Sequence, residues 1–240
     1  MGFVSDELQN EFNENGYVIV DNLFDENTYQ KLASAAYLLT IDKMNLIEKD
    51  RKIDLVDILE FICNKPNYPI ANTKNSYLSR SHLDCRADKL IDTIANNLIA
   101  ADIPNKLLSH KAKRAEFKGY ISLLPEDKVR GINNLHQDYP LDYEVNDLIM
   151  CWSPISPVDE ANFRIIPGTH KLGALPQEVF GQFKQLPPKI TEQFKDSIKT
   201  VEVKLGQTII FNTKTVHSLD KNFTSKTNWS FFVSFEKDFN

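Results

Sequence analysis

Two histidines of this chain stand two residues before an aspartate, in LHQDYP (His136, Asp138) and in SHLD (His82, Asp84). An imidazole and a carboxylate together are ligands that suit divalent iron. In extended chain, residues i and i+2 lie on the same face, roughly 6.6 Å apart. Residues 133–139 are compatible with extended chain, so one metal ion can lie between His136 and Asp138. Asp84 instead precedes an apolar helical segment, and we interpret it as a helix N-cap.

A metal site of this kind needs a third ligand. Two imidazoles and one carboxylate leave about three positions of an octahedral Fe(II) open on one side, as the binding of O₂ and a co-substrate requires. His217 follows a β-type run at residues 208–211, so a partner strand can deliver it to the same place. His170 competes with it, although Pro-Gly at positions 167–168 suits a type II turn and favours a structural or surface role for this histidine. His110 is interpreted as a solvated surface residue.

The segments that must position these side chains change in character along the chain. Helical patterns come first, at residues 6–12 behind Ser5, 26–39 behind Asp25, 44–63 and 84–101, with a loop predicted at 64–80. Short β-type runs occur at residues 17–20 and then, after about residue 114, at 117–124, 148–152, 163–166, 200–203, 208–211 and 229–235. This order indicates an α+β fold with helices packed on antiparallel sheets. We predict one domain over residues 1–240, helix-rich over 1–113 and with a β core over about 114–236.

Composition and the absence of certain motifs argue against several classes of function. The chain has 240 residues, 42% hydrophobic and 25% charged, so its core needs neither a disulfide nor a structural metal. A net charge of −5 with scattered lysines argues against nucleic acid as a partner. The sequence contains no GxSxG, GxxxxGK or GxGxxG motif, which argues against nucleotide hydrolysis and dinucleotide binding.

The predicted location is the cytoplasm. The three cysteines are far apart and form no CxxC pair, as expected in a reducing compartment. The N-terminus opens with acidic residues and does not resemble a secretory signal. The longest apolar stretch, residues 90–103, is broken by two aspartates and two asparagines, so we predict no membrane span.

Four segments resemble the phytanoyl-CoA dioxygenase family of Fe(II)- and 2-oxoglutarate-dependent oxygenases in letters, order and spacing. They are FNENGYVIVDNLFDENTYQKL, LHQDYP, WSPISPVDEANFRIIPGTHKLG and GQTIIFNTKTVHSLDKNFTSKTNWSFFVSF. The resemblance implies a double-stranded β-helix, a cupin-like jelly-roll barrel with the N-terminal helices packed outside. It also implies that His136, Asp138 and His217 hold the iron.

The same resemblance implies an activity. The family oxidises C–H bonds with 2-oxoglutarate and O₂, so the expected substrate is a small molecule or a carrier-linked metabolite. The protein positions the target carbon and excludes water, and no catalytic residue is expected beyond the metal ligands.

One position departs from the family in a way that bears on function. The family has an arginine eleven residues after the distal histidine, which binds the remote carboxylate of 2-oxoglutarate, and a hydroxyl residue two positions later. Here these positions are Asn228 and Ser230. A carboxylate removed from water without a cation loses several kcal/mol relative to an arginine pair, so 2-oxoglutarate should bind weakly unless another cation takes over. Cations near in sequence are Lys226, Lys214 and Arg164. A further departure, Ala161 in place of a family glycine, is interpreted as a local turn adjustment.

Three readings of the function stay open on the sequence. The first is an iron oxygenase that uses 2-oxoglutarate. The second is a barrel that keeps the iron ligands but has lost normal co-substrate binding and has a binding or regulatory role. The third is an oxygenase with a different source of electrons, such as the substrate itself. Asn228 separates the first reading from the other two. Residues 37–130 match no family segment and are expected to cover the barrel mouth.

Overall fold

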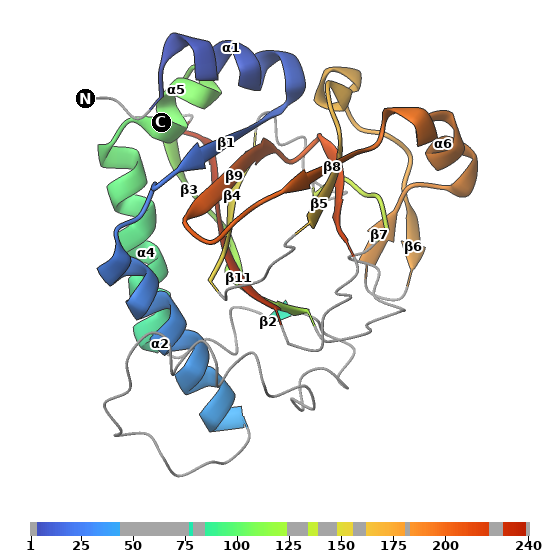
Figure 1. Cartoon of the computed structure of the whole chain (residues 1–240). Coiled ribbons are helices and arrows are strands. Elements are labelled where there is room, and N and C mark those ends of the chain that lie inside the picture. Colours follow the sequence, from blue (N-terminus) through green and yellow to red (C-terminus); the bar gives the residue numbers. More distant parts are fainter. Residues whose placement is uncertain are drawn as a thin grey trace.

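The computed structural model describes residues 4–43, 77–78, 85–123, 134–138, 148–155, 162–180, 183–220 and 228–238. The helices formed by the first 110 residues gather on one side of the molecule, strands form its centre, and the short helix at residues 188–193 lies on the other side (Figure 1). None of the helices that the model describes is long and apolar enough to cross a membrane.

The N-terminal helices begin and end where local chemistry dictates. Helix α1 (Asp6–Asn15) begins after Ser5, whose hydroxyl accepts a hydrogen bond from the Leu8 N–H, and ends at Gly16 in the left-handed conformation with φ of 78°. Helix α2 (Glu26–Lys43) begins after Asp25, whose carboxylate accepts from the Thr28 N–H at 2.7 Å. Helices α4 (Cys85–Ala100) and α5 (Ile103–Leu108) follow.

These helices confirm three of the four helical predictions. The predicted helix at 44–63 lies outside the described residues, as do His82, Asp84 and most of the predicted loop at 64–80. Two residues of that loop form the short strand β2 (Tyr77–Leu78) instead.

The main sheet contains six antiparallel strands in the order β1-β9-β4-β11-β3-β2. Besides β2, its strands are β1 (Tyr17–Asp21), β9 (Gln207–Asn212), β4 (Leu148–Pro154), β11 (Asn228–Lys237) and β3 (Ala112–Leu123). The first strand of the chain pairs with the ninth, with Tyr17 opposite Phe211. Two segments far apart in the sequence therefore pair in one sheet.

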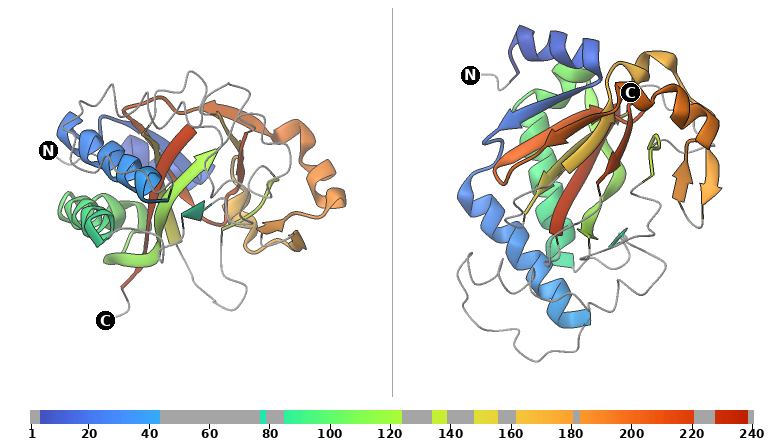
Figure 2. Two further views of the ribbon diagram at one scale, coloured as in Figure 1. Left: turned by 90° about the horizontal axis from the view of Figure 1, so that it is seen from below. Right: turned by 45° about the vertical axis from the view of Figure 1, so that its right-hand side comes forward.

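The two faces of this sheet have different neighbours because side chains alternate along each strand. One face carries Val18, Cys151 and Ile210, which belong to the same buried cluster as Leu32 of α2 and Ile91 of α4. The helices thus cover this face (Figures 1 and 2).

The opposite face of the main sheet packs against a smaller sheet. That sheet has the order β10-β5-β8, formed by β10 (Val216–Leu219), β5 (Asn162–Ile166) and β8 (Lys199–Glu202). The second core between the two sheets consists of Met150, Trp152, Phe163, Ile165, Val203, Ile209, Phe211, Leu219 and Phe232. The metal-ligand candidates lie beside this core.

Outside the smaller sheet lie a β6 (Glu178–Phe180) and β7 (Phe183–Gln185) hairpin and the short helix α6 (Pro188–Gln193). The predicted combination of helices with antiparallel sheets is confirmed, and every predicted β-type run lies in or overlaps a strand. Among the described strands the sheets are open and do not close into a barrel. The sequence patterns missed α5, α6, β6, β7 and β10.

Candidate metal centre

The site is built on a short extended segment, residues 134–138, that pairs with the start of β10. His136 and His217 form an isolated antiparallel bridge in which each N–H donates to the carbonyl of the other at 2.9 Å. Two residues on, the Asp138 N–H donates to the Thr213 carbonyl, also at 2.9 Å. Residues directly opposite in an antiparallel pair point to the same face, so this pairing brings both imidazoles and the carboxylate together.

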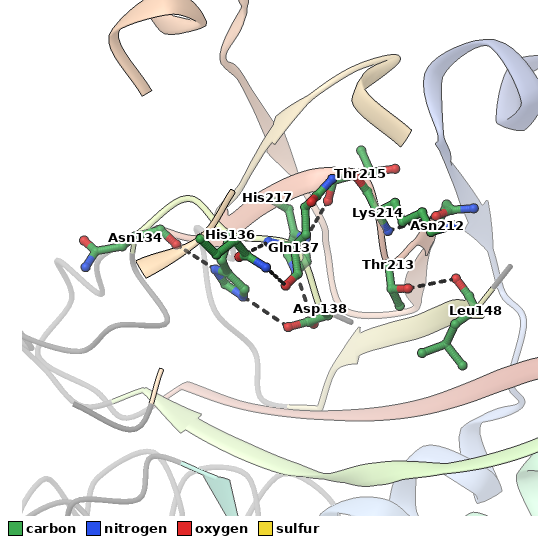
Figure 3. A network of polar contacts seen from close by, with 11 residues as sticks. Asn134, His136, Gln137, Asp138, Leu148, Asn212, Thr213, Lys214, Thr215 and His217 are labelled. Carbon is green, nitrogen blue, oxygen red and sulfur yellow. Dashed lines mark hydrogen bonds and ion pairs between the residues drawn. The ribbon is translucent and has the colours of Figure 1, made fainter. Parts of the chain in front are cut away.

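The three side chains converge on one point (Figure 3). One ligand atom from each of His136, Asp138 and His217 can be chosen so that all lie within 4.8 Å of one another, and no other such group of three occurs among the described residues. The two carboxylate oxygens of Asp138 divide between the histidines: Oδ1 lies 3.3 Å from His136 Nε2, and Oδ2 lies 3.3 Å from His217 Nε2.

Each imidazole is oriented from behind by a main-chain carbonyl. His136 Nδ1 lies 2.6 Å from the Asn134 carbonyl, and His217 Nδ1 lies 2.9 Å from the Thr215 carbonyl. A carbonyl can only accept, so Nδ1 carries the proton in both rings. Nε2 is then the ring atom that faces the Asp138 carboxylate in both histidines. This is the orientation of histidines that bind a metal through Nε2.

The electrostatics of the site favour a cation between the three groups. Burial would raise the pKa of Asp138, but attraction to His217 and hydrogen bonds with both histidines outweigh burial and hold this pKa well below its usual value. Burial would lower the pKa of His136, but the hydrogen bond and charge of Asp138, helped by the Asn134 carbonyl, raise it instead. A negative carboxylate between two imidazoles thus attracts positive charge.

The carboxylate is the most exposed of the three ligands. The side chains of His136 and His217 are 8% and 4% exposed, whereas that of Asp138 is 18% exposed. Phe163 stacks on the His217 ring with centroids 5.3 Å apart and planes at 8°, and the Phe211 ring lies 4.5 Å away. Aromatic rings therefore line the site on the side of the core between the sheets.

Trp152 extends this aromatic wall. Its ring lies 5.5 Å from Phe163 and belongs to the same core. Its Nε1 is buried, and no described residue accepts a hydrogen bond from it. A buried N–H without a partner costs free energy, so such groups in native structures call for an explanation. Sequence reasoning missed Trp152, because only the structure tells that its donor is unpaired.

The other histidines lie elsewhere. His170 belongs to the short 3-10 helix Thr169–Leu172 that follows β5. It packs against Gly16, with its Nε2 at 3.2 Å from the Asn13 carbonyl. It joins no group of metal-ligating side chains among the described residues. His110 is exposed at the end of α5, as predicted. The structure therefore groups His217, and not His170, with the HxD segment.

The predicted co-substrate residues fall on β11. Ser230 is 4% exposed and pairs with Pro154 of β4. It alternates with Trp229 and Phe231, which face the helices, so Ser230 lies on the same face as Phe232, toward the second core. The Asn228 backbone begins β11 opposite Leu123; its side chain lies outside the described residues.

Of the cations considered as substitutes, Arg164 is badly placed. It alternates with Phe163 and Ile165, whose side chains lie in the core beside His217, so Arg164 is on the outer face of β5. Lys214 is half-buried in the turn between β9 and β10, close to the ligand segment. Lys226 and Ala161 lie outside the described residues.

One comparison with known proteins identifies a family. A family model described as phytanoyl-CoA dioxygenase (PhyH) matches residues 12–228. No curated protein sequence matches this chain at a significant level.

Similar solved structures include "non-heme alpha ketoglutarate dependent carbocyclase SnoK from nogalamycin biosynthesis", with a TM-score of 0.67 and 16% identity over 98% of this chain and 84% of that one. AviO1 from Streptomyces viridochromogenes Tue57 has a TM-score of 0.61 and 11% identity over 100% and 97% of the two chains. The epimerase SnoN, solved with Fe3+, alpha ketoglutarate and nogalamycin RO, has a TM-score of 0.60 and 17% identity over 97% and 83%. At these identities the likeness shows a shared fold.

Proposed function

The chain belongs to the phytanoyl-CoA dioxygenase family, as its sequence segments predict, and from that membership we propose that it is a non-haem Fe(II)-dependent oxygenase. It hydroxylates or otherwise oxidises a small-molecule or carrier-linked metabolite with 2-oxoglutarate and O₂. The observation that carries this proposal is the convergence of His136, Asp138 and His217. We further propose a single cytoplasmic domain over residues 1–240, in which the six-stranded and three-stranded sheets are the two halves of a double-stranded β-helix.

The donor set fits iron. Two neutral imidazoles and one carboxylate on one side of an ion leave the other side open, which is the ligand pattern of non-haem Fe(II) oxygenases. Both Nε2 atoms point toward the carboxylate, and both Nδ1 atoms already have carbonyl partners. Such partners fix the ring orientation that a metal needs.

The core beside the ligands suits a co-substrate that carries a carboxylate. The Trp152 Nε1–H is a buried donor without a described partner, and one aromatic ring, Phe163, stands between Trp152 and His217. Ser230 adds a hydroxyl on the same side of the main sheet. We propose that these two donors face bound 2-oxoglutarate.

Bound iron would supply, with 2-oxoglutarate and O₂, the oxidation of a C–H bond. The chain's own residues then have three tasks. His136, Asp138 and His217 hold the metal. Phe163 and Phe211 exclude water from its inner side, since an apolar wall leaves no room for hydration. Trp152 and Ser230 orient the co-substrate by donating hydrogen bonds.

Asn228 favours a second candidate function. It stands where the family has the arginine that binds the remote carboxylate, and Arg164 faces away from the core. Without a cation in that place the protein is an iron-binding barrel that lacks normal 2-oxoglutarate binding. It would then have a binding role, or it would oxidise its substrate with a different source of electrons.

One experiment separates these functions. Crystals grown without oxygen and soaked with Fe(II) and 2-oxoglutarate should contain iron bound by His136, Asp138 and His217, with the co-substrate chelating it. Iron without 2-oxoglutarate at saturating concentration would favour the second candidate. Iron bound at other residues would contradict both.

A further inference from the structure

The extended segment at residues 134–138, called the ligand segment below, has two hydrogen-bonding edges. The two edges have different kinds of partner. On one edge, His136 and Asp138 make main-chain hydrogen bonds to β10 and to the turn before it. Gln137, between them, directs its main-chain groups to the other edge. Its N–H donates to Gln177 Oε1 at 2.9 Å, and its carbonyl accepts from Gln177 Nε2 at 3.1 Å. A single side-chain amide thus takes the place of a neighbouring strand.

The Gln137 side chain makes the reverse connection. It is 1% exposed and lies on the opposite face from the two ligands. Its Nε2 donates to the Gly173 carbonyl at 3.0 Å and also to the Lys214 carbonyl, and its Oε1 accepts from the Leu175 N–H at 2.8 Å. Both donors of the amide are therefore used, and two other segments, residues 173–175 and the turn at Lys214, are tied to one side chain.

The position of these bonds relates them to the ligands. Lys214 immediately precedes Thr215, whose carbonyl orients the His217 ring (Figure 3). The main chain of Gln137 joins the other two ligands directly. The Gln137 side chain thus links the segment that carries His136 and Asp138 to the turn that orients His217, and Gln177 holds the same segment from the far edge.

We propose that Gln137 and Gln177 form a reciprocal amide clamp that sets the spacing of the three metal ligands. They act as positioning residues and do not touch the metal. The inference rests on the proposed metal centre. Metal–ligand distances tolerate only about 0.2 Å, so a small shift of the ligand segment against the turn lowers affinity. Loss of groups that orient ligands typically weakens metal binding by about 10- to 100-fold.

The test replaces Gln177, which is half-buried, by Met. Gln177→Met keeps the length of the side chain and removes both hydrogen bonds to Gln137. Co(II) is titrated into the metal-free protein, and the melting temperature is measured without metal. We expect Co(II) binding about 10- to 100-fold weaker than in the parent, together with a changed Co(II) absorption spectrum, which reports ligand geometry.

Gln207→Met is the matched control. Gln207 also accepts a hydrogen bond from a main-chain N–H, that of Lys204 at 2.9 Å, and donates one to Asp21 at 2.8 Å. It is the first residue of β9, at the end of this strand that is away from the ligands. The same chemical change there should lower stability without altering Co(II) affinity. Gln177→Glu keeps the acceptor for the Gln137 N–H and loses the donor, so its affinity should fall between those of the parent and Gln177→Met. It also serves as the test if Gln177→Met does not fold.

The outcomes separate this inference from the proposed function. Co(II) affinity within twofold of the parent in both Gln177 variants would overturn the clamp, as would an equal loss in Gln207→Met. A parent that does not bind Co(II), or binding that survives in His217→Ala, would overturn the metal centre itself and the clamp with it.

Discussion

His136 and His217 face each other across a single β-bridge, with their ring centroids 4.6 Å apart. The carbonyl that orients each ring belongs to the residue two positions before it, Asn134 or Thr215. The two halves of the site therefore repeat one local arrangement on two paired pieces of chain. Main-chain pairing sets the register between the halves, and the side-chain amides of Gln137 and Gln177 hold the paired segments in place.

Metal binding should depend on these ligands and not on His170. We expect one Fe(II), or Mn(II) or Ni(II) in its place, per chain. His136→Ala, Asp138→Ala and His217→Ala should each abolish binding, because two remaining ligands hold such an ion weakly. His170→Ala should bind as the parent does, since His170 packs against Gly16 instead. Titration calorimetry on all four variants decides this, and loss of binding only in His170→Ala would reverse the assignment.

Binding of 2-oxoglutarate should be weak and should improve in Asn228→Arg. Hydrogen bonds to charged groups contribute about 1.5 to 3 kcal/mol and neutral ones about 1 kcal/mol. A deficit on the order of 1.5 to 3 kcal/mol corresponds to roughly 10- to 150-fold in Kd. We expect the arginine to recover part of this factor in titrations of the metal-loaded protein without oxygen. If the parent binds 2-oxoglutarate tightly, another cation must bind its remote carboxylate, and Lys214 and Lys226 are then to be tested by substitution.

Trp152→Phe should weaken the binding of 2-oxoglutarate while it changes the stability of the protein little. Removing an unpaired buried N–H relieves a cost, while the smaller ring loses packing, so the free energy of unfolding should change by less than about 1.5 kcal/mol. Affinity for 2-oxoglutarate should fall by about tenfold or more if the N–H meets a carboxylate. Trp229→Phe, on the helix face of the same sheet, is the control and should leave that affinity unchanged. Equal affinities in all three proteins would remove Trp152 from the co-substrate site.

His170 should make the protein less stable in acid. Burial, helped by the charge of Lys171, lowers the pKa of His170 below its usual 6.5 despite the Asn13 carbonyl. The unfolded chain therefore binds this proton more tightly than the folded one. The stability of the neutral form is complete above the unfolded pKa of 6.5 and is lost as pH falls from there toward the folded pKa.

In His170→Gln this loss should disappear. The difference between the two unfolding curves should have a slope below the roughly 1.4 kcal/mol per pH unit that one site can contribute. Denaturant unfolding between about pH 5 and 8 measures it. His110→Gln, an exposed histidine, is the control, and parallel curves for the parent and His170→Gln would contradict the account.

Gly16→Ala should be more destabilising than Gly168→Ala. Both glycines have a left-handed backbone, with φ of 78° and 79°, so both substitutions carry a conformational cost of about 1 to 2 kcal/mol. At Gly16 the added Cβ would also meet His170 Nδ1 and Thr215 Oγ1, whereas at Gly168 the nearest atom is 3.7 Å away. Overpacking adds about 1 to 3 kcal/mol, which unfolding in denaturant resolves. Equal losses of stability in the two variants would show that the side chains of His170 and Thr215 move aside at no cost.

Local sequence signals predicted the parts of the fold that local chemistry determines. Ser5 and Asp25 mark helix starts because N-capping involves only neighbouring residues. The HxD spacing predicted that His136 and Asp138 share a face. The strand β10 was missed because Val216–Leu219 is a short run with two polar residues, all of them buried by the smaller sheet.

Other features depend on partners that are distant in sequence. The choice of His217 over His170 as the neighbour of Asp138 follows from the bridge to His136, and the spacing of the histidines alone left both open. The hydrogen bonds of Gln137 connect it to Gly173, Leu175 and Lys214, and no local pattern indicates such partners. Main-chain carbonyls orient the ligands, and every residue has such a carbonyl, so residue types do not indicate which ones do so.

The pairing of β1 with β9 has a consequence for synthesis of the protein. Tyr17 is synthesised almost 200 residues before its partner Phe211. During that interval the strand at Tyr17–Asp21 has an edge with nothing to pair with, which exposes it to aggregation and to chaperones. Strand β1 can join the main sheet only once β9 has been made, and His217 follows β9 within a few residues. Iron capture is therefore expected only after synthesis has passed His217.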